Sequence, residues 1–366
     1  MVEIKELEVK KDASVFSQIS EHQHEQIVFC HDHETGLKAI IGIHNTVLGP
    51  ALGGTRMWSY ATEAEALNDV LRLSRGMTYK AAISGLNLGG GKAVIIGDSR
   101  KDKSEAFMRK YGRFVENLNG KYITAEDVGT TSKDMEYIKM ETDHVTGLPE
   151  SMGGSGDPSP VTAYGVYVGM KAAAKRAFGS DNLAGKRISV QGTGHVGGYL
   201  IDHLVKEGAE LFITDIDQDR LKDINSRTGA KIVGLDEIYD LDVDIYSPCA
   251  LGATINDNTL GRLKCQVIAG AANNQLKDET IHGPALMEKG IVYAPDFLIN
   301  AGGLINVYSE LNGYNRKAAY DQTENIFDYT LNIFDLAERE GIYTQLAAMK
   351  MAEKRIADIS KVRATY

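Results

Sequence analysis

Residues 187–215 read RISVQGTGHVGGYLIDHLVKEGAELFITD. The run RISVQ is typical of a buried strand, the segment after the glycines has the apolar spacing of a helix, and AELFITD is typical of a second strand. Gly192, Gly194 and Gly197 stand between the first strand and the helix at the spacing of a GxGxxG motif. A GxGxxG motif alone is weak evidence, but in this context it predicts a dinucleotide-binding βαβ unit.

Each glycine of the turn has a physical purpose in such a unit. Gly192 makes the tight turn, Gly194 lets backbone N–H groups approach a pyrophosphate, and Gly197 allows the helix to pack closely on the strand. The pyrophosphate would lie at the helix N-terminus, where unpaired amides and the helix dipole favour an anion. The expected cofactor-binding residues of the turn and first helical positions are Gly192, Thr193, Gly194, His195, Val196, Gly197 and Gly198.

Asp215 ends the second strand at roughly the 20-residue interval expected of a ribose-binding carboxylate. Such a carboxylate accepts hydrogen bonds from the adenosine ribose and repels the 2′-phosphate of NADP, so NAD is the expected cofactor. The alternative is that Asp215 only caps a turn, which would keep the dinucleotide fold and remove the preference for NAD.

The segments after Asp215 continue the alternation of strands and helices. AKIVG, VDIYSPCA, QVIAGAAN and IVYAPDFLIN are typical of strands, so we expect an α/β fold with a Rossmann-type doubly wound parallel sheet in residues 148–329. The stretch 147–160 is rich in Gly, Ser and Pro, as an interdomain hinge is. Residues 1–147 would form a first α/β domain separated from the second by a cleft, and the helical segment from about 330 to 366 is expected to return to it.

The first half of the chain begins with a predicted hairpin, in which IVFC and LKAIIGIHN are joined by the polar turn HDHETG. A helix is expected from Thr62, because Thr62 and Glu65 have the spacing of a capping box. Charged residues surround the four histidines that flank the hairpin, and no carboxylates stand at ligand spacing, so no metal site is expected there. These histidines are His22, His24, His31 and His33.

Composition limits the partners and the compartment. The formal net charge is −10, which disfavours binding to nucleic acid or to anionic lipid. Cys30, Cys249 and Cys265 are scattered and odd in number, as expected for reduced thiols in the cytoplasm. Charges interrupt residues 1–11 where a signal peptide needs an apolar run, and the chain has no apolar stretch long enough to span a membrane.

Lys80 and Lys92 bracket a glycine loop and are the strongest candidates for chemistry in the first half. The loop is not a phosphate-binding P-loop, because Leu86 replaces its first glycine and Ala93 replaces its Ser or Thr. Most lysines are solvated surface residues, so composition alone gives neither lysine a function.

Seven segments, in order along nearly the whole chain, carry a resemblance to a known family. They are ALGGTRM, GMTYKAAISGLNLGGGK, YITAEDVGT, VTAYGVYVGMKAAAK, SPCALGATIN, IAGAANNQL and YAPDFLINAGG. In these segments the sequence resembles the glutamate, leucine, phenylalanine and valine dehydrogenases, and is most similar to the leucine enzymes. The resemblance implies NAD-dependent, reversible deamination of L-leucine and other branched-chain L-amino acids to 2-oxo acids and ammonia.

The resemblance also implies individual functions. Lys92 would be the catalytic lysine, Lys80 would bind the substrate carboxylate, and Asp127 would take part in proton transfer. This agrees with the chemistry, since amine oxidation and water attack on the imine need a base, and a nearby cation and partial burial would favour a neutral Lys92 amine. Further substrate-binding positions are Gly53 and Gly54, which let the main chain approach the substrate or are ordinary turn glycines, then Met77, and Asn273 or Asn274.

Side-chain selectivity follows from the same resemblance, which implies a pocket lined by Leu52, Ala125, Leu304 and Val307. Leu52 stands where glutamate enzymes carry a lysine, so a buried acidic substrate would lack a partner, whereas an isobutyl group would gain about 1.5–3 kcal/mol from burial. Ala125 is typical of the leucine enzymes, whereas Leu304 is typical of the phenylalanine enzymes. Valine or phenylalanine dehydrogenase activity is therefore an alternative, and a catalytically silent NAD-binding regulatory protein is a more distant one. The resemblance further implies a homo-oligomer, an octamer, assembled through the first domain.

Overall fold

The computed structural model describes residues 14–363, which fold into two compact units. The first unit contains residues 14–156, 310–314 and 353–363, and the second contains 157–309 and 315–352. Residues 1–13, where no signal peptide is expected, lie outside the described residues. The division differs from the expected one for 330–352, because α12 (Ile326–Glu340) buries Ile326, Ile333 and Phe334 and packs on α5 (Ser159–Phe178) of the second unit.

The first unit is built on a five-stranded sheet of order β1-β2-β4-β3-β5. Its strands are β1 (Gln26–His31), β2 (Lys38–Asn45), β3 (Ala51–Trp58), β4 (Gly89–Ile96) and β5 (Tyr122–Glu126). The predicted hairpin is confirmed, since β1 and β2 pair antiparallel. Strand β3 pairs in parallel with both β4 and β5, so the carboxyl ends of these three strands share one edge of the sheet.

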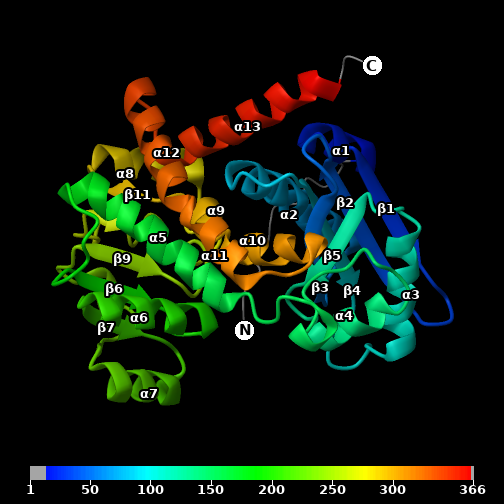
Figure 1. The fold of residues 1–366 in the computed structure, drawn as a ribbon, viewed down its shortest axis with the longest axis horizontal. Coiled ribbons are helices and arrows are strands. Elements are labelled where there is room, and N and C mark those ends of the chain that lie inside the picture. The colour runs from blue at the N-terminus through cyan, green and yellow to red at the C-terminus, as the bar shows by residue number, and fades with distance from the viewer. Residues whose placement is uncertain (1–13, 364–366) are drawn as a thin grey trace. The chain divides into compact units, whose positions relative to one another are not determined.

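Helices cover both faces of this sheet (Figure 1). The helices of the unit are α1 (Val15–His22), α2 (Glu63–Ile83), α3 (Glu105–Glu116) and α4 (Ser132–Lys139). Alternating strand residues divide the core, with Ile40 and Val94 packing on α2 and Ile41 and Ile95 packing on α3 and α4. Thr62 caps α2 as predicted by accepting from Glu65 N at 3.1 Å, but the Glu65 carboxylate accepts from Ala61 N, one residue before the capping-box partner.

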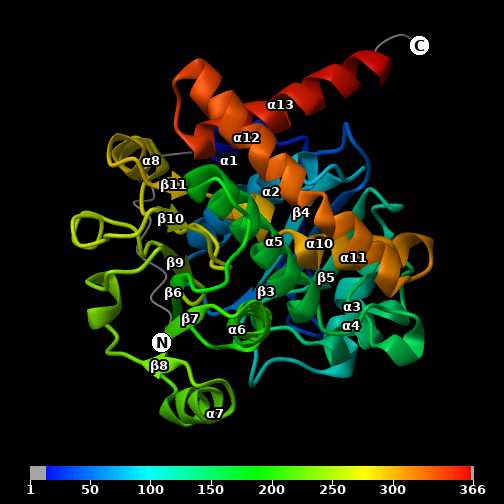
Figure 2. The same ribbon diagram turned by 60° about the vertical axis from the view of Figure 1, so that its left-hand side comes forward.

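The second unit is built on a six-stranded parallel sheet of order β11-β10-β9-β6-β7-β8, which runs down the left of Figure 2. Its strands are β6 (Arg187–Gln191), β7 (Glu210–Thr214), β8 (Lys231–Ile232), β9 (Ile245–Pro248), β10 (Val267–Ile268) and β11 (Val292–Tyr293). Each of the predicted strand segments contains one of these strands. The strand order reverses between β6 and β9, which is where ligands bind in doubly wound sheets. The predicted α/β fold with a doubly wound parallel sheet is confirmed.

The helices of the second unit connect and cover these strands. They are α5, α6 (His195–Glu207), α7 (Gln218–Thr228), α8 (Glu279–Glu288), α9 (Asp296–Ile299), α10 (Gly302–Tyr308), α11 (Arg316–Glu324), α12 and α13 (Thr344–Arg363), the last of which begins in this unit and ends in the first. Within residues 14–363 no helix combines the length and apolar character needed to cross a membrane.

Two histidines of the first unit, His24 and His44, are buried, whereas the histidines that flank the hairpin were expected to be surrounded by solvated charges. His24 and His44 are both 8% exposed, and their rings lie in edge contact with centroids 4.8 Å apart. His24 Nε2 is hydrogen-bonded to Ser74 Oγ, and His44 Nδ1 to Thr78 Oγ1, each at 2.7 Å. The pair thus fastens β2 and the segment before β1 to α2. Among residues 14–363 no three His, Cys, Asp or Glu side chains are grouped to hold a metal ion.

Candidate active site

The glycine turn of the second unit joins β6 to α6. Gly192 has φ of 101°, and a Cβ there would lie 2.6 Å from Ala250 Cβ. A Cβ at Gly197 would lie 2.1 Å from the Gly192 carbonyl oxygen, so the helix can approach the turn only without a side chain. Gly194 differs, because the nearest atom to an added Cβ is Arg220 Nη1 at 3.9 Å. No side chain of the described residues caps α6 at Gly194, so the first helical N–H groups remain available to an anion.

Asp215 holds the turn to the end of β7. Its carboxylate accepts from Thr193 N at 2.6 Å, from Thr193 Oγ1 at 3.0 Å and from Asp217 N at 3.0 Å. Burial opposes ionisation, but the N–H groups of Asp217 and Thr193 lower the pKa of Asp215 below its usual value. Asp215 therefore does stabilise a turn, as the alternative interpretation of this residue expected. A carboxylate has about four lone-pair sites, so Asp215 can still accept from a ribose hydroxyl.

A hollow of about 300 Å³ adjoins the turn. Thr193, Gly194, His195 and Gly198 line it on one side, and Arg220 and Arg227 come from α7 on the other. The sequence reasoning gave neither arginine a function. Their position in the sequence was the available signal, because α7 begins shortly after Asp215, the residue that follows β7, and Arg220 lies in the first turn of α7.

Lys92 and Asp127 form the central ion pair of the first unit. Lys92 lies on β4 and is 7% exposed, and Asp127 directly follows β5. Strand β3 separates β4 from β5 in the sheet, yet Lys92 Nζ reaches Asp127 Oδ2. Burial raises the pKa of Asp127, but the charges of Lys92 and Arg56 outweigh it and lower that pKa to about 2. The structure thus brings together the residue expected from the family resemblance to be the catalytic lysine and the residue expected to take part in proton transfer.

The glycines beside this pair have a packing reason. A Cβ at Gly53 would lie 1.7 Å from the Gly91 carbonyl oxygen, and one at Gly54 would lie 2.5 Å from the Glu126 carbonyl oxygen. A Cβ at Gly90 would lie 2.1 Å from Thr78 Oγ1. The missing side chains let β3 approach β4 and β5, and let β4 approach α2. This brings the helix that carries Lys80 in its last turn against the strand that carries Lys92.

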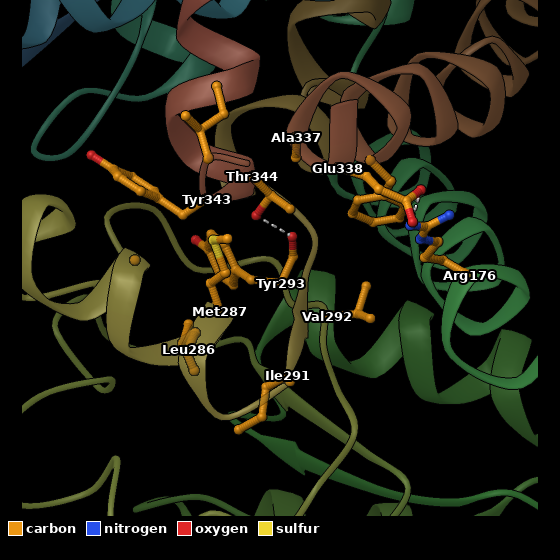
Figure 3. A pocket seen from close by; sticks show the side chains of 14 residues that line it. Arg176, Leu286, Met287, Ile291, Val292, Tyr293, Ala337, Glu338, Tyr343 and Thr344 are labelled. Atoms are coloured by element: carbon orange, nitrogen blue, oxygen red, sulfur yellow. Dashed lines mark hydrogen bonds and ion pairs between the residues drawn. The ribbon is translucent and has the colours of Figure 1, made fainter. Parts of the chain in front are cut away.

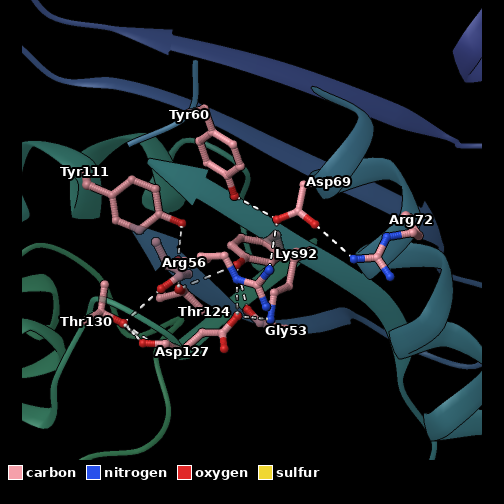
Figure 4. A network of polar contacts seen from close by, with 12 residues as sticks. Gly53, Arg56, Tyr60, Asp69, Arg72, Lys92, Tyr111, Thr124, Asp127 and Thr130 are labelled. Atoms are coloured by element: carbon pink, nitrogen blue, oxygen red, sulfur yellow. Dashed lines mark hydrogen bonds and ion pairs between the residues drawn. The ribbon is translucent and has the colours of Figure 1, made fainter. Parts of the chain in front are cut away.

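Further charged side chains extend the ion pair into a network that sequence reasoning missed (Figure 4). Arg56 Nε lies 3.5 Å from Asp127 Oδ2, and Arg56 Nη1 donates to Asp69 Oδ2 at 2.9 Å. Tyr60 Oη donates to the same Asp69 oxygen at 2.7 Å. One signal was present in the sequence, because Asp69 follows Ala66 by three residues on the apolar face of α2, where an aspartate needs a buried partner.

Comparison with known proteins gives the same family for both units. Residues 24–144 match the model described as the Glu/Leu/Phe/Val dehydrogenase dimerisation domain. Residues 153–218 and 210–363 match the model described as Glutamate/Leucine/Phenylalanine/Valine dehydrogenase. The chain belongs to the Glu/Leu/Phe/Val dehydrogenase family.

Individual members of this family are similar over nearly their full length. Leucine dehydrogenase of Thermoactinomyces intermedius is 59% identical over 352 residues, which is 96% of each chain. L-Tryptophan dehydrogenase of Nostoc punctiforme is 48% identical over 344 residues, covering 94% of this chain and 96% of the relative. A crystal structure of L-tryptophan dehydrogenase from Nostoc punctiforme superposes with a TM-score of 0.86 at 46% identity, covering 95% of this chain and 100% of that one.

The residues expected to line the side-chain pocket of this dehydrogenase are distributed over both units. In the first, Leu52 and Ala125 are 2% and 7% exposed on neighbouring strands, and Met77 lies on α2 one turn before Lys80. In the second, Leu304 and Val307 lie on α10, where Leu304 is 7% exposed.

The two candidate asparagines of the second unit have different surroundings. Asn273 Oδ1 accepts from Asn300 Nδ2 at 2.8 Å, so its amide is held by the chain. Asn274 adopts a left-handed φ of 53°, and its carbonyl accepts from Ala253 N at 2.7 Å. The contacts therefore orient the Asn273 side chain and the Asn274 main chain.

The second unit of this dehydrogenase contains another hollow (Figure 3). It measures about 260 Å³ and is lined mainly by apolar side chains of α8, β11, α12 and the start of α13. Arg176 and Glu338 form an ion pair of 2.5 Å at its side. None of the sequence-predicted site residues lines it.

Proposed function

We propose that this chain catalyses the NAD-dependent oxidative deamination of L-leucine and other branched-chain L-amino acids, reversibly. The amino acid, NAD⁺ and water give the 2-oxo acid, ammonium, NADH and one proton. The observation that carries this proposal is the buried Lys92–Asp127 pair at the glycine loop, in a chain that is 59% identical to a leucine dehydrogenase.

Lys92 and Asp127 are proposed to carry out the proton transfers. Lys92, in its neutral form, takes a proton from the water that attacks the imine carbon, and Asp127 relays a proton to the departing amine. Lys80 stays charged and binds the substrate carboxylate, which fixes Cα in one orientation. Gly53 and Gly54 supply main-chain groups, although packing alone already explains why they are glycines.

The residues of the glycine turn fit a dinucleotide. The N-terminus of α6 has N–H groups for a pyrophosphate, and Gly194 has no side chain to obstruct its approach. The nicotinamide of bound NAD supplies the hydride acceptor. Asp215 is proposed to accept from the adenosine ribose while it holds Thr193, and its charge disfavours NADP.

The substrate side chain is proposed to contact Leu52, Ala125, Leu304 and Val307. A carboxylate buried beside Leu52 would lack a charged partner, so glutamate is excluded. Leu304, together with the 48% identity to a tryptophan dehydrogenase, favours an aromatic amino acid as the second candidate substrate. One methylene changes binding by only about 1–3 kcal/mol, so leucine, valine and isoleucine should all react.

The test is NADH formation with a panel of L-amino acids. We expect leucine, isoleucine and valine to give the highest kcat/KM, phenylalanine a lower one, and glutamate none. NADP should replace NAD poorly. Comparable rates with glutamate and leucine would contradict the proposed pocket, and the absence of NADH formation with every amino acid would favour the silent NAD-binding alternative.

The assembly and the compartment are also proposals. Residues 24–144 match a model described as a dimerisation domain, and we propose a homo-oligomer, an octamer, built through the first unit. Light scattering of the purified protein tests its size. We propose a cytoplasmic location, because Cys30, Cys249 and Cys265 are free thiols.

A further inference from the structure

The buried network beside the Lys92–Asp127 pair contains a second cation, Arg56, that contacts Asp127. Arg56 lies between two carboxylates, with Nη1 bonded to Asp69 and Nε 3.5 Å from Asp127 Oδ2. The side chains of Arg56, Asp69 and Asp127 are 19%, 5% and 19% exposed. Charges this far from water are costly unless they are paired, so each carboxylate depends on the guanidinium.

In the proposed reaction, the extent to which Asp127 depends on the Arg56 charge changes during turnover. Lys92 must alternate between its charged and neutral forms if it acts as a base. While Lys92 is neutral, Asp127 loses its closest cation and becomes a buried carboxylate that would take up a proton itself. A guanidinium does not deprotonate in proteins, so Arg56 supplies a charge that persists through both states of Lys92.

The orientation of Arg56 fits this purpose. Its Nε is buried and makes no hydrogen bond within the described residues, while Nη1 is already engaged by Asp69. The Nε–H group of Arg56 therefore lies beside Asp127 and is available to donate a hydrogen bond to its carboxylate. Tyr60 Oη donates at 2.7 Å to the same Asp69 oxygen that accepts from Arg56, and so fixes the carboxylate that orients the guanidinium. Arg72 contacts only the other oxygen, at 3.2 Å, from a side chain that is 42% exposed, so it contributes little to this orientation.

We propose that Arg56 is a positioning residue of the reaction, which keeps Asp127 ionised and directed at Lys92 while the charge of Lys92 changes. Asp69 and Tyr60 fix the guanidinium in that position. The inference rests on the proposed function, because it assumes that Lys92 and Asp127 transfer protons. A purely structural Arg56 would need only its bond to Asp69, which ties β3 to α2.

The test compares Arg56→Met and Arg56→Lys with a matched control, Arg72→Gln. Arg72 also pairs with Asp69, at 3.2 Å, but its side chain is 42% exposed, and within residues 14–363 Asp69 is its only ionic partner. Reductive amination is measured from about pH 5 to about pH 9, where an acid limb reports the Lys92–Asp127 pair as one titrating unit rather than Asp127 alone. NAD affinity, measured by fluorescence, and thermal unfolding are recorded for each variant.

For Arg56→Met we expect kcat to fall about 10- to 100-fold with unchanged NAD affinity, and the acid limb to move up by about one pH unit or more. The pH shift is the decisive result, because Asp127 should become easier to protonate. Arg56→Lys keeps the positive charge but loses the planar, bidentate guanidinium. Its acid limb should therefore stay near the wild-type pH, and its kcat should lie between those of wild type and Arg56→Met. Arg72→Gln should leave both the limb and kcat within about twofold of wild type.

A folded Arg56→Met enzyme with an unshifted acid limb would overturn the inference, whatever its kcat. If Arg56→Met does not fold, Tyr60→Phe decides, since it removes a single hydroxyl from Asp69 and should move the limb in the same direction by a smaller amount. An unshifted limb in Tyr60→Phe would then overturn it. The proposed function fails separately, when the wild-type enzyme itself oxidises no amino acid.

Discussion

The buried pair His24 and His44 should make the free energy of unfolding fall as the pH is lowered. Burial and the neighbouring His44 lower the pKa of His24 from 6.5 to about 3, and burial and Arg75 lower that of His44 from 6.5 to about 4. Both folded-state values lie below the unfolded value, so the unfolded chain binds more protons in this range. Stability is therefore complete above about pH 6.5 and is lost as the pH falls toward the folded-state values.

The size of the effect follows from linkage. Between pH 7 and pH 5, each histidine should remove about 2 kcal/mol from the free energy of unfolding, so the pair removes about 4 kcal/mol. The loss is set mainly by the unfolded-state pKa of 6.5, because both folded-state pKa values lie below pH 5. The affected contacts are those to Ser74 and Thr78 on α2, the helix that carries Lys80 in its last turn, so acid should also lower activity.

The assay is urea unfolding at pH 7 and pH 5 at one fixed protein concentration, because the stability of an oligomer depends on concentration. In His24→Gln and His44→Gln, the loss between the two pH values should be smaller than in wild type by about 2 kcal/mol each. His33→Gln is the control, since His33 is exposed in the turn between β1 and β2. If His24→Gln and His44→Gln lose as much stability as wild type, the buried neutral histidines are not the cause and the reasoning is refuted.

Three further predictions concern the proposed site. Lys92→Ala should fold and bind NAD, with kcat lower by at least about 10²-fold and without the ascending limb of oxidative deamination; near-normal kcat with an unchanged pH profile would eliminate Lys92 as the base. Lys80→Ala should raise KM for leucine and move that limb to higher pH, because a neighbouring cation is lost; an unchanged KM would contradict carboxylate binding. Asp215→Ser should erode the preference for NAD over NADP, as measured by kcat/KM for both cofactors, and should also loosen the turn that Asp215 holds through Thr193.

The dinucleotide half could be predicted from the sequence because its signals are local. The strand, glycine turn, helix and second strand of residues 187–215 are consecutive, and each residue type is dictated by its immediate neighbours. Gly192 and Gly197 are glycines for the expected reasons, a left-handed φ and a close helix–strand approach. The two lysines were also found in the sequence, but their functions came from family resemblance rather than from spacing.

What only the tertiary structure decided are the contacts between residues distant in the sequence. Arg56 and Asp69 meet because β3 lies under α2, and Asp127 reaches Lys92 across β3, which no local pattern encodes. His24 stands among charged residues in the sequence but is buried in the fold, because the segment before β1 turns back onto α2. Burial depends on which elements pack together, and the electrostatic state of a buried group depends on the charges that packing brings beside it. The sequence therefore supplied the candidate residues of the site, and the fold decided which of them form an ion pair and which further charge lies beside that pair.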